Sequence, residues 1–157
     1  MEIARSIYRQ IKEKLEPGKV LVIYGPRRVG KTFLLQKLVR DEFVKKEKLA
    51  FFKGDSRTVQ DNLSSQNSQK LISFIGRDTS LLIIDEAQKI PEVGSNLKIL
   101  VDDFPYLKII ASGSASFDLA QKLGEPLTGR KKNPPAVSGF GFGINQNRPP
   151  AVLRGDF

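Results

Sequence analysis

A loop with the composition of a polyphosphate cradle follows the apolar segment 20–24. Residues 25–32 read Gly-Pro-Arg-Arg-Val-Gly-Lys-Thr and fit the pattern G-x-x-x-x-G-K-[ST]. The oxygens of a polyphosphate need several donors that converge on a small volume, and the inward-pointing backbone N–H groups of a glycine-containing loop supply them. A helix that begins near Gly30 would add its positive end. The pattern therefore predicts a binding site for a nucleoside triphosphate.

Two side chains of this loop have separate tasks in the prediction. Lys31 reaches the β- and γ-phosphates as a point charge, and the hydroxyl of Thr32 binds Mg²⁺. The residues that we expect to contact the nucleotide are Gly25, Pro26, Arg27, Arg28, Val29, Gly30, Lys31, Thr32 and Phe33.

Two adjacent acids follow a second apolar segment, residues 81–84. A segment of this kind is typical of a buried parallel strand, whose carboxyl end lies at the edge of the sheet where ligands bind. Asp85 at this edge is predicted to hold Mg²⁺ through water. Glu86, one residue further, is predicted to orient and deprotonate the water that attacks the γ-phosphate.

Polar side chains also follow the apolar segment 107–111. We expect Ser114 to meet the γ-phosphate or the attacking water at the end of this strand, with Ser112 as the alternative. Arg130 is a candidate for an arginine that neutralises developing charge, from the same chain or from a second one. A serine- and glycine-rich turn and an ordinary surface arginine would account for the same residues.

The elements that must position these residues alternate between strands and helices. Strands are predicted at 20–24, 49–52, 81–84 and 107–111, where β-branched and other apolar residues gather. Apolar residues at helical spacing predict helices at 3–15, about 31–46, 71–75, around 97–101 and 117–123. Residues 55–68 are polar and are predicted to form a loop. This order favours the α/β class, a parallel sheet with helices on both faces.

Together these motifs resemble a known family. Residues 25–32, 83–88 (Ile-Ile-Asp-Glu-Ala-Gln), 112–116 (Ser-Gly-Ser-Ala-Ser) and 124–130 (Gly-Glu-Pro-Leu-Thr-Gly-Arg) are similar, in order and spacing, to prokaryotic AAA-type ATPases with an appended C-terminal domain of unknown function. The resemblance covers residues 1–132. It implies a P-loop NTPase three-layer sandwich in which the strand bearing Asp85 is not adjacent to the strand before the loop. It also implies ATP and Mg²⁺, hydrolysis assisted by Glu86, a sensor role for Ser114 and an arginine role for Arg130.

The sequence departs from this family after Arg130. Residues 133–157 contain four prolines and four glycines and show neither helical nor alternating apolar spacing. We therefore expect an AAA-type ATP-binding domain over 1–132, followed over 133–157 by an irregular Pro/Gly-rich segment that nucleotide binding does not need. Because the family's fifth strand and lid are not recognisable, the sheet is expected to be incomplete, and the ATPase to be truncated and weakly active.

Composition limits the function further. The chain of 157 residues has no cysteine and no histidine, which excludes disulfides, thiolate metal sites and imidazole bases. No apolar run approaches the roughly 20 residues of a membrane span, and a cytoplasmic location is expected. The net charge of +9 suits a polyanionic partner, either a nucleotide or a nucleic acid, or is simply a solvated basic surface.

The predicted function is Mg²⁺-dependent hydrolysis of ATP. A GTPase is disfavoured because no [NT]-K-x-D sequence is present to read guanine, and a nucleotide kinase because the two adjacent acids favour water as the acceptor. The alternative is a module that binds nucleotide without hydrolysing it, or one that binds nucleic acid. The sequence leaves open whether a protein partner or a second copy of the chain senses the nucleotide state.

Overall fold

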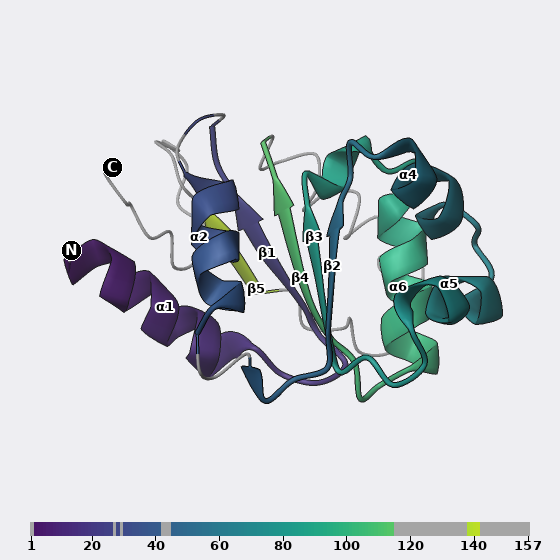
Figure 1. Cartoon of the computed structure of the whole chain (residues 1–157), viewed down its shortest axis with the longest axis horizontal. Coiled ribbons are helices and arrows are strands. Elements are labelled where there is room, and N and C mark those ends of the chain that lie inside the picture. The colour runs from purple at the N-terminus through teal and green to yellow at the C-terminus, as the bar shows by residue number, and fades with distance from the viewer. Residues whose placement is uncertain (1, 27, 29, 42–44, 115–137, 142–157) are drawn as a thin grey trace, which may run out of the picture.

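The computed structural model describes residues 2–26, 28, 30–41, 45–114 and 138–141. Strands and helices alternate along the chain as predicted (Figure 1). In chain order the elements are α1 (Glu2–Lys14), β1 (Val20–Tyr24), α2 (Lys31–Val39), β2 (Leu49–Lys53), α4 (Arg57–Leu63), α5 (Ser68–Ile75), β3 (Leu81–Asp85), the 3₁₀ turn η1 (Ala87–Lys89), α6 (Val93–Asp103), β4 (Lys108–Gly113) and β5 (Ser138–Gly141).

Five parallel strands form one sheet in the order β2-β3-β4-β1-β5. β4 pairs with β1 on one side, with Ile109 opposite Val20, and with β3 on the other, with Lys108 opposite Leu81. β4 therefore separates the strand before the phosphate loop from the strand that ends in Asp85, as the family resemblance implies. Because all the strands are parallel, their carboxyl ends share one edge of the sheet, the upper edge in Figure 1.

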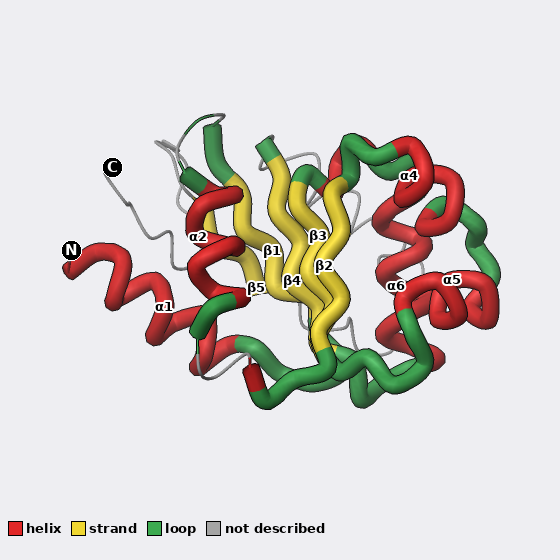
Figure 2. The backbone as a smooth tube through the Cα atoms, viewed as in Figure 1, coloured by secondary structure: helices red, strands yellow, loops and turns green. Residues whose placement is uncertain are grey.

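Helices cover both faces of the sheet, so the predicted three-layer α/β architecture is confirmed (Figure 2). Successive strand residues point to opposite faces, which produces two separate cores. The core under α1 and α2 contains Ile7, Ile11, Leu21, Ile23, Leu35, Leu38, Leu81, Ile83 and Ile110. The core under α4, α5 and α6 contains Val22, Val59, Leu71, Leu82, Ile84, Leu97, Leu100 and Ile109. No helix in the described ranges is long and apolar enough to cross a membrane.

The helix after the phosphate loop is shorter than predicted. α2 ends at Val39, where Arg40 caps it, whereas the sequence predicted a helix to about residue 46. Phe33 lies in α2 but is 69% exposed. Leu34, Leu35 and Leu38 fill the face of α2 that packs on the sheet.

The segment 55–68 is not simply a loop, because it contains α4. Val59 and Leu63 lie four residues apart on one face of this helix, and both are buried against the sheet. An apolar pair at this spacing is a helical signal, which the polar residues around it obscured. The predicted loop is therefore wrong over residues 57–63.

The sheet also has the fifth strand that the sequence did not reveal. β5 pairs in parallel with β1, with Ser138 opposite Leu21 and Gly141 opposite Tyr24. The expectation of an incomplete sheet, and of irregular structure throughout 133–157, is wrong at these four positions. Parallel pairing uses backbone N–H and C=O groups, so a short strand in which Gly139 and Gly141 interrupt any apolar alternation leaves little trace in the sequence.

Candidate functional site

The phosphate loop joins the end of β1 to the start of α2, at the carboxyl edge of the sheet. The N–H of Gly25 donates to the carbonyl of Gly113, which ties the start of the loop to the end of β4 (N···O 3.3 Å). Gly30, at φ 89°, adopts the left-handed conformation that glycine tolerates best, and α2 begins at the next residue. Of the nine predicted contact residues, Arg27 and Val29 lie outside the described residues. Gly25, Pro26, Arg28 and Gly30 lie in the loop, and Lys31, Thr32 and Phe33 form the first turn of α2.

Lys31 is a buried cation, with only 5% of the residue exposed. Its Nζ donates to the carbonyl oxygens of Gly25 (2.8 Å) and Pro26 (2.6 Å), so the ammonium group lies across the mouth of the loop. Burial lowers the pKa of Lys31 below its ordinary 10.5, although the charges of Glu86 and Asp85 act in the opposite direction. An anionic phosphate oxygen is a stronger acceptor than a carbonyl, and its charge would stabilise the ammonium form.

Asp85 joins the loop to the centre of the sheet. This carboxylate is nearly buried at the end of β3, where its Oδ2 accepts from the hydroxyl of Thr32 (2.7 Å) and its Oδ1 from the hydroxyl of Ser112 (2.5 Å). The same Ser112 oxygen accepts from the backbone N–H of Glu86 (3.1 Å). Ser112, the alternative to Ser114 in the sequence prediction, therefore holds the acidic pair in place from the neighbouring strand β4.

Glu86 sits in a turn whose backbone is constrained. Its φ and ψ of 54° and 44° are left-handed, a conformation that costs a non-glycine residue about 1–3 kcal/mol and occurs often at functional sites. A Cβ on Gly54, after β2, would lie 2.2 Å from the carbonyl oxygen of Glu86, so only glycine fits there. The carboxylate of Glu86 accepts a hydrogen bond from the side-chain nitrogen of Gln88. This nitrogen also donates to the hydroxyl of Ser114 (3.0 Å).

A cavity of about 420 Å³ opens at this edge of the sheet. Its size is within the range of small-molecule sites. Three of its residues, Lys53, Asp55 and Lys89, were not predicted from the sequence. Lys53 and Asp55 flank the end of β2, so the rule that ligands bind at the carboxyl ends of parallel strands could have identified them. The described residues that line the cavity are Arg28, Thr32, Lys53, Asp55, Asp85, Glu86 and Lys89.

The oxygen donors that line this cavity are suitable ligands for a Mg²⁺ ion that a bound polyphosphate would also coordinate. Thr32 and Asp85 present hard oxygen donors, and the Thr32 oxygen keeps lone pairs for a cation while its hydrogen points to Asp85. Among the described residues, no group of three or more acidic side chains could hold a metal alone. Mg²⁺ commonly binds through one or two protein oxygens together with water and substrate phosphates. These residues therefore suit a metal that arrives with its nucleotide.

The structure brings together most of the predicted site residues. Asp85 ends β3, and Glu86 and Ser114 directly follow β3 and β4. Lys31 begins α2, and its Nζ bonds to the carbonyl of Gly25, the residue after β1. Arg130 lies outside the described residues. Phe33 is exposed on the first turn of α2, and its contact with a nucleotide stays a prediction.

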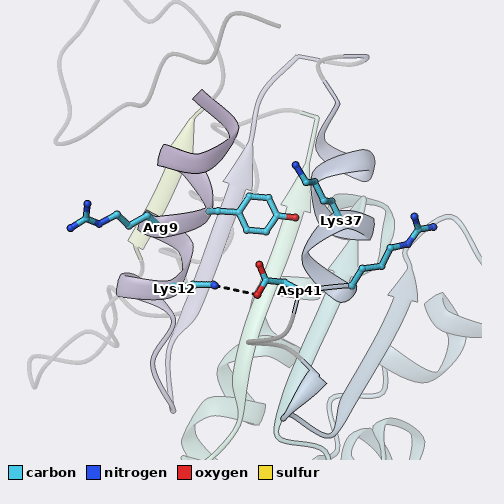
Figure 3. A pocket seen from close by; sticks show the side chains of 6 residues that line it. Arg9, Lys12, Lys37 and Asp41 are labelled. Atoms are coloured by element: carbon cyan, nitrogen blue, oxygen red, sulfur yellow. Dashed lines mark ion pairs between the residues drawn. The ribbon is translucent and has the colours of Figure 1, made fainter. Parts of the chain in front are cut away.

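A second and larger cavity, of about 620 Å³, lies between α1 and α2 (Figure 3). Lys12 on α1 and Asp41 after α2 face each other as an ion pair (3.1 Å), and Lys37 lies over the ring of Tyr8 (5.4 Å to its centre). Burial, with a smaller effect of the Asp41 charge, raises the pKa of Tyr8 from 10.0 to about 12. With Arg9 and Arg40, the described part of this lining holds four basic side chains and one acid. The described lining residues are Tyr8, Arg9, Lys12, Lys37, Arg40 and Asp41.

Comparison with known proteins gives a family and a relative. A family model described as AAA domain matches residues 17–138. A protein of Methanocaldococcus jannaschii, named "Uncharacterized protein MJ1544", is 32% identical over 127 residues. The match covers 81% of this chain and 28% of that protein, so the chain spans little more than a quarter of its relative's length.

Solved structures share the fold at low sequence identity. The replication initiator DnaA, solved with AMPPCP and single-stranded DNA, is similar with a TM-score of 0.52 and 15% identity. The similarity covers 87% of this chain and 45% of the DnaA chain. It supports the P-loop NTPase architecture that the strand order displays.

Proposed function

The chain belongs to the AAA domain family, and from this membership and the geometry of the site we propose that it binds Mg·ATP and hydrolyses it. One observation carries the proposal. The phosphate-loop Lys31 and Thr32 share the carboxyl edge of the sheet with Asp85 and Glu86, although more than 50 residues separate the two pairs. DnaA, whose fold is similar, was solved with the ATP analogue AMPPCP, which agrees with this choice of ligand.

In the proposed complex, different groups of the chain bind the phosphates and the metal. Loop N–H groups and the ammonium group of Lys31 bind the phosphates, exchanging the carbonyl contacts of Gly25 and Pro26 for phosphate oxygens. Thr32 and Asp85 would hold Mg²⁺, with Asp85 acting through water. When bound there, Mg²⁺ would supply positive charge that offsets the negative charge developing on the phosphates.

Glu86 is the proposed general base. Its carboxylate orients the attacking water and accepts its proton as the oxygen attacks the γ-phosphorus. The bond between that phosphorus and the β–γ bridging oxygen breaks, so the products are ADP and inorganic phosphate. Ser114 is proposed to sense the γ-phosphate, and Arg130 to neutralise charge, in accordance with the family resemblance.

Calorimetric titration tests nucleotide binding directly. ATP, ADP and GTP are each titrated into the protein with and without Mg²⁺, and we expect ATP to bind most tightly when Mg²⁺ is present. Lys31→Ala is expected to abolish ATP binding without unfolding the domain, because the Lys31 ammonium bonds to the loop carbonyls of Gly25 and Pro26. Equal ATP affinity for this variant and the parent would refute the assignment of the site.

Phosphate release tests hydrolysis. Glu86→Gln keeps the shape of the side chain and removes the base, so we expect Mg·ATP binding to persist while the rate falls at least about tenfold, given that a general base typically contributes 10²–10⁴. A variant with the parent's rate would remove Glu86 from the mechanism.

Charge on one face supports a second candidate function, the binding of nucleic acid. Arg9, Lys12, Lys37 and Arg40 line the cavity between α1 and α2, Asp41 is the one acid among its described lining residues, and the chain's net charge is +9. The structure of DnaA with single-stranded DNA shows a protein of similar fold in such a complex. Phosphates bound by these side chains would displace counterions, so affinity should fall steeply with salt.

Charge reversal tests this second function. Fluorescence anisotropy with a labelled single-stranded oligonucleotide gives the slope of log K against log salt. Lys37→Glu/Arg40→Glu should weaken binding and reduce this slope by about two if both residues contact phosphate. Arg57→Glu/Lys70→Glu, on the opposite face of the sheet, makes the same change in net charge and serves as the control. Equal effects of the two double variants would exclude the cavity between α1 and α2 as the binding surface.

A further inference from the structure

Gln88 connects two residues of the site that directly follow two different strands. It belongs to the turn η1, directly after β3, and its Nε2 donates both to the Glu86 carboxylate and to the Ser114 hydroxyl (3.0 Å). Its carbonyl oxygen Oε1 is buried and has no hydrogen-bond partner in the described part of the chain. A buried acceptor without a partner costs about 1–3 kcal/mol, so the orientation of this amide calls for an explanation.

The two donated bonds provide that explanation. An amide nitrogen carries two hydrogens, and Gln88 directs one toward each partner. The reversed amide would place Oε1 against the carboxylate of Glu86, oxygen against oxygen. The unpartnered oxygen is therefore the consequence of directing both donors at Glu86 and Ser114.

The turn that carries Gln88 is built to bring these groups together. Glu86 adopts its left-handed conformation immediately before η1, and Ala87, which is fully buried, anchors the turn between Glu86 and Gln88. Ser114 follows the last residue of β4, the strand that neighbours β3. The bonds of Gln88 thus span the carboxyl ends of two adjacent strands.

We propose that Gln88 is a positioning residue for hydrolysis: its amide fixes the Glu86 carboxylate in one orientation and couples it to Ser114. The proposal rests on the proposed function, in which Glu86 is the base. The Gln88 bond occupies Oε2 of Glu86 and leaves Oε1 to receive the proton of the attacking water. A change at Ser114 when it contacts the γ-phosphate would pass through the same amide to Glu86. Gln88 itself is not among the described residues that line the cavity.

Kinetics separates positioning from a purely structural role. Gln88→Ala should lower kcat by about tenfold to a hundredfold, since small misplacements of a catalytic group have effects of this size. The affinity for Mg·ATP should stay within about threefold of the parent's, because Lys31 and Thr32 are untouched. Gln69→Ala, which removes a glutamine on α5 that contacts Arg77, is the matched control and should leave both quantities unchanged.

A double-mutant cycle with Glu86 gives the decisive result. If Gln88 acts through Glu86, adding Gln88→Ala to Glu86→Gln should not lower the residual rate further. A full additional loss in the double variant, an unchanged kcat in Gln88→Ala, or a loss of ATP affinity equal to the loss of kcat would each overturn the proposal.

Side-chain NMR detects the hydrogen bonds of the Gln88 amide without any measurement of hydrolysis. The ¹H–¹⁵N signals of the Gln88 amide, assigned as the pair missing in Gln88→Ala, should shift in both Glu86→Gln and Ser114→Ala. Signals that respond to neither variant would refute the contact itself. A parent that shows no hydrolysis, or one whose rate Glu86→Gln leaves unchanged, would refute the proposed function and the positioning role of Gln88. The NMR result would still establish whether Gln88 links the two residues.

Discussion

Replacing Ser112 by alanine removes one hydroxyl that serves two partners at the centre of the site. This oxygen donates to the buried carboxylate of Asp85 (2.5 Å) and accepts from the backbone N–H of Glu86 (3.1 Å). Ser112 is itself fully buried, and alanine occupies nearly the same volume, so water does not replace the missing group and no large cavity forms. The effect of the variant therefore measures these two hydrogen bonds.

The expected loss follows from the two partners. A hydrogen bond to a charged group contributes about 1.5–3 kcal/mol and a neutral one about 0.5–1.5 kcal/mol. Asp85 keeps the bond from Thr32, so we expect the free energy of unfolding to fall by about 2–4 kcal/mol in total. For a domain of this size, that loss lowers Tm by roughly 4–16 °C.

Urea denaturation followed by circular dichroism measures this loss. Ser114→Ala is the matched control, because Ser114 is only half-buried and its hydroxyl contacts only the side chain of Gln88 among the bonds described here. We expect the control to lose less than about 1 kcal/mol. If the free energies of unfolding of Ser112→Ala and Ser114→Ala agreed within about 0.5 kcal/mol, the reasoning would be refuted. The Ser112 hydroxyl would then not make its two stabilising hydrogen bonds.

Three further predictions concern the loop, the turn and the sheet edge. Because burial lowers the pKa of Lys31 below 10.5 and phosphate requires its charged form, ATP affinity should fall as pH rises toward 10.5, with proton uptake on binding. Calorimetry in buffers of different ionisation enthalpy checks this, and Lys31→Arg should lack the fall. Gly54→Ala should push the Glu86 backbone away, lowering stability by about 1–3 kcal/mol and slowing hydrolysis. Parent-like stability and rate would contradict the close packing. A chain ending at Lys132 lacks β5 and should be less stable by about 1–3 kcal/mol in urea than one ending at Gly143, which keeps that strand. Equal midpoints would show that β5 adds nothing to the sheet.

Much of the site could be predicted because its signals are local. The spacing from Gly25 to Thr32 specifies a loop and the start of a helix, and both depend on residues that are neighbours in the chain. The acids after β3 were likewise predicted from a run of four apolar residues, since a buried parallel strand ends where such a run ends. Lys53 and Asp55 followed the same rule but were missed, because no motif drew attention to the end of β2.

The exposure of Phe33 and the strand β5, which the sequence did not predict, also have physical causes. Phe33 fits an apolar pattern, yet the sheet has room for only one face of α2, and the three leucines fill it. β5 could not be recognised because its pairing with β1 depends on backbone groups that every residue type carries, and its glycines hide any pattern of side chains.

The sequence by itself determined the phosphate loop, the acidic pair and the alternation of strands and helices, because each depends on contacts within a few residues. The tertiary structure alone decided that Ser112 would hold Asp85 and that Gln88 would join Glu86 to Ser114, pairs that lie 26 or 27 residues apart along the chain. These contacts exist because β4 inserts between β3 and β1. That strand order is fixed by how the helices pack across both faces of the sheet, which no local stretch of the chain specifies.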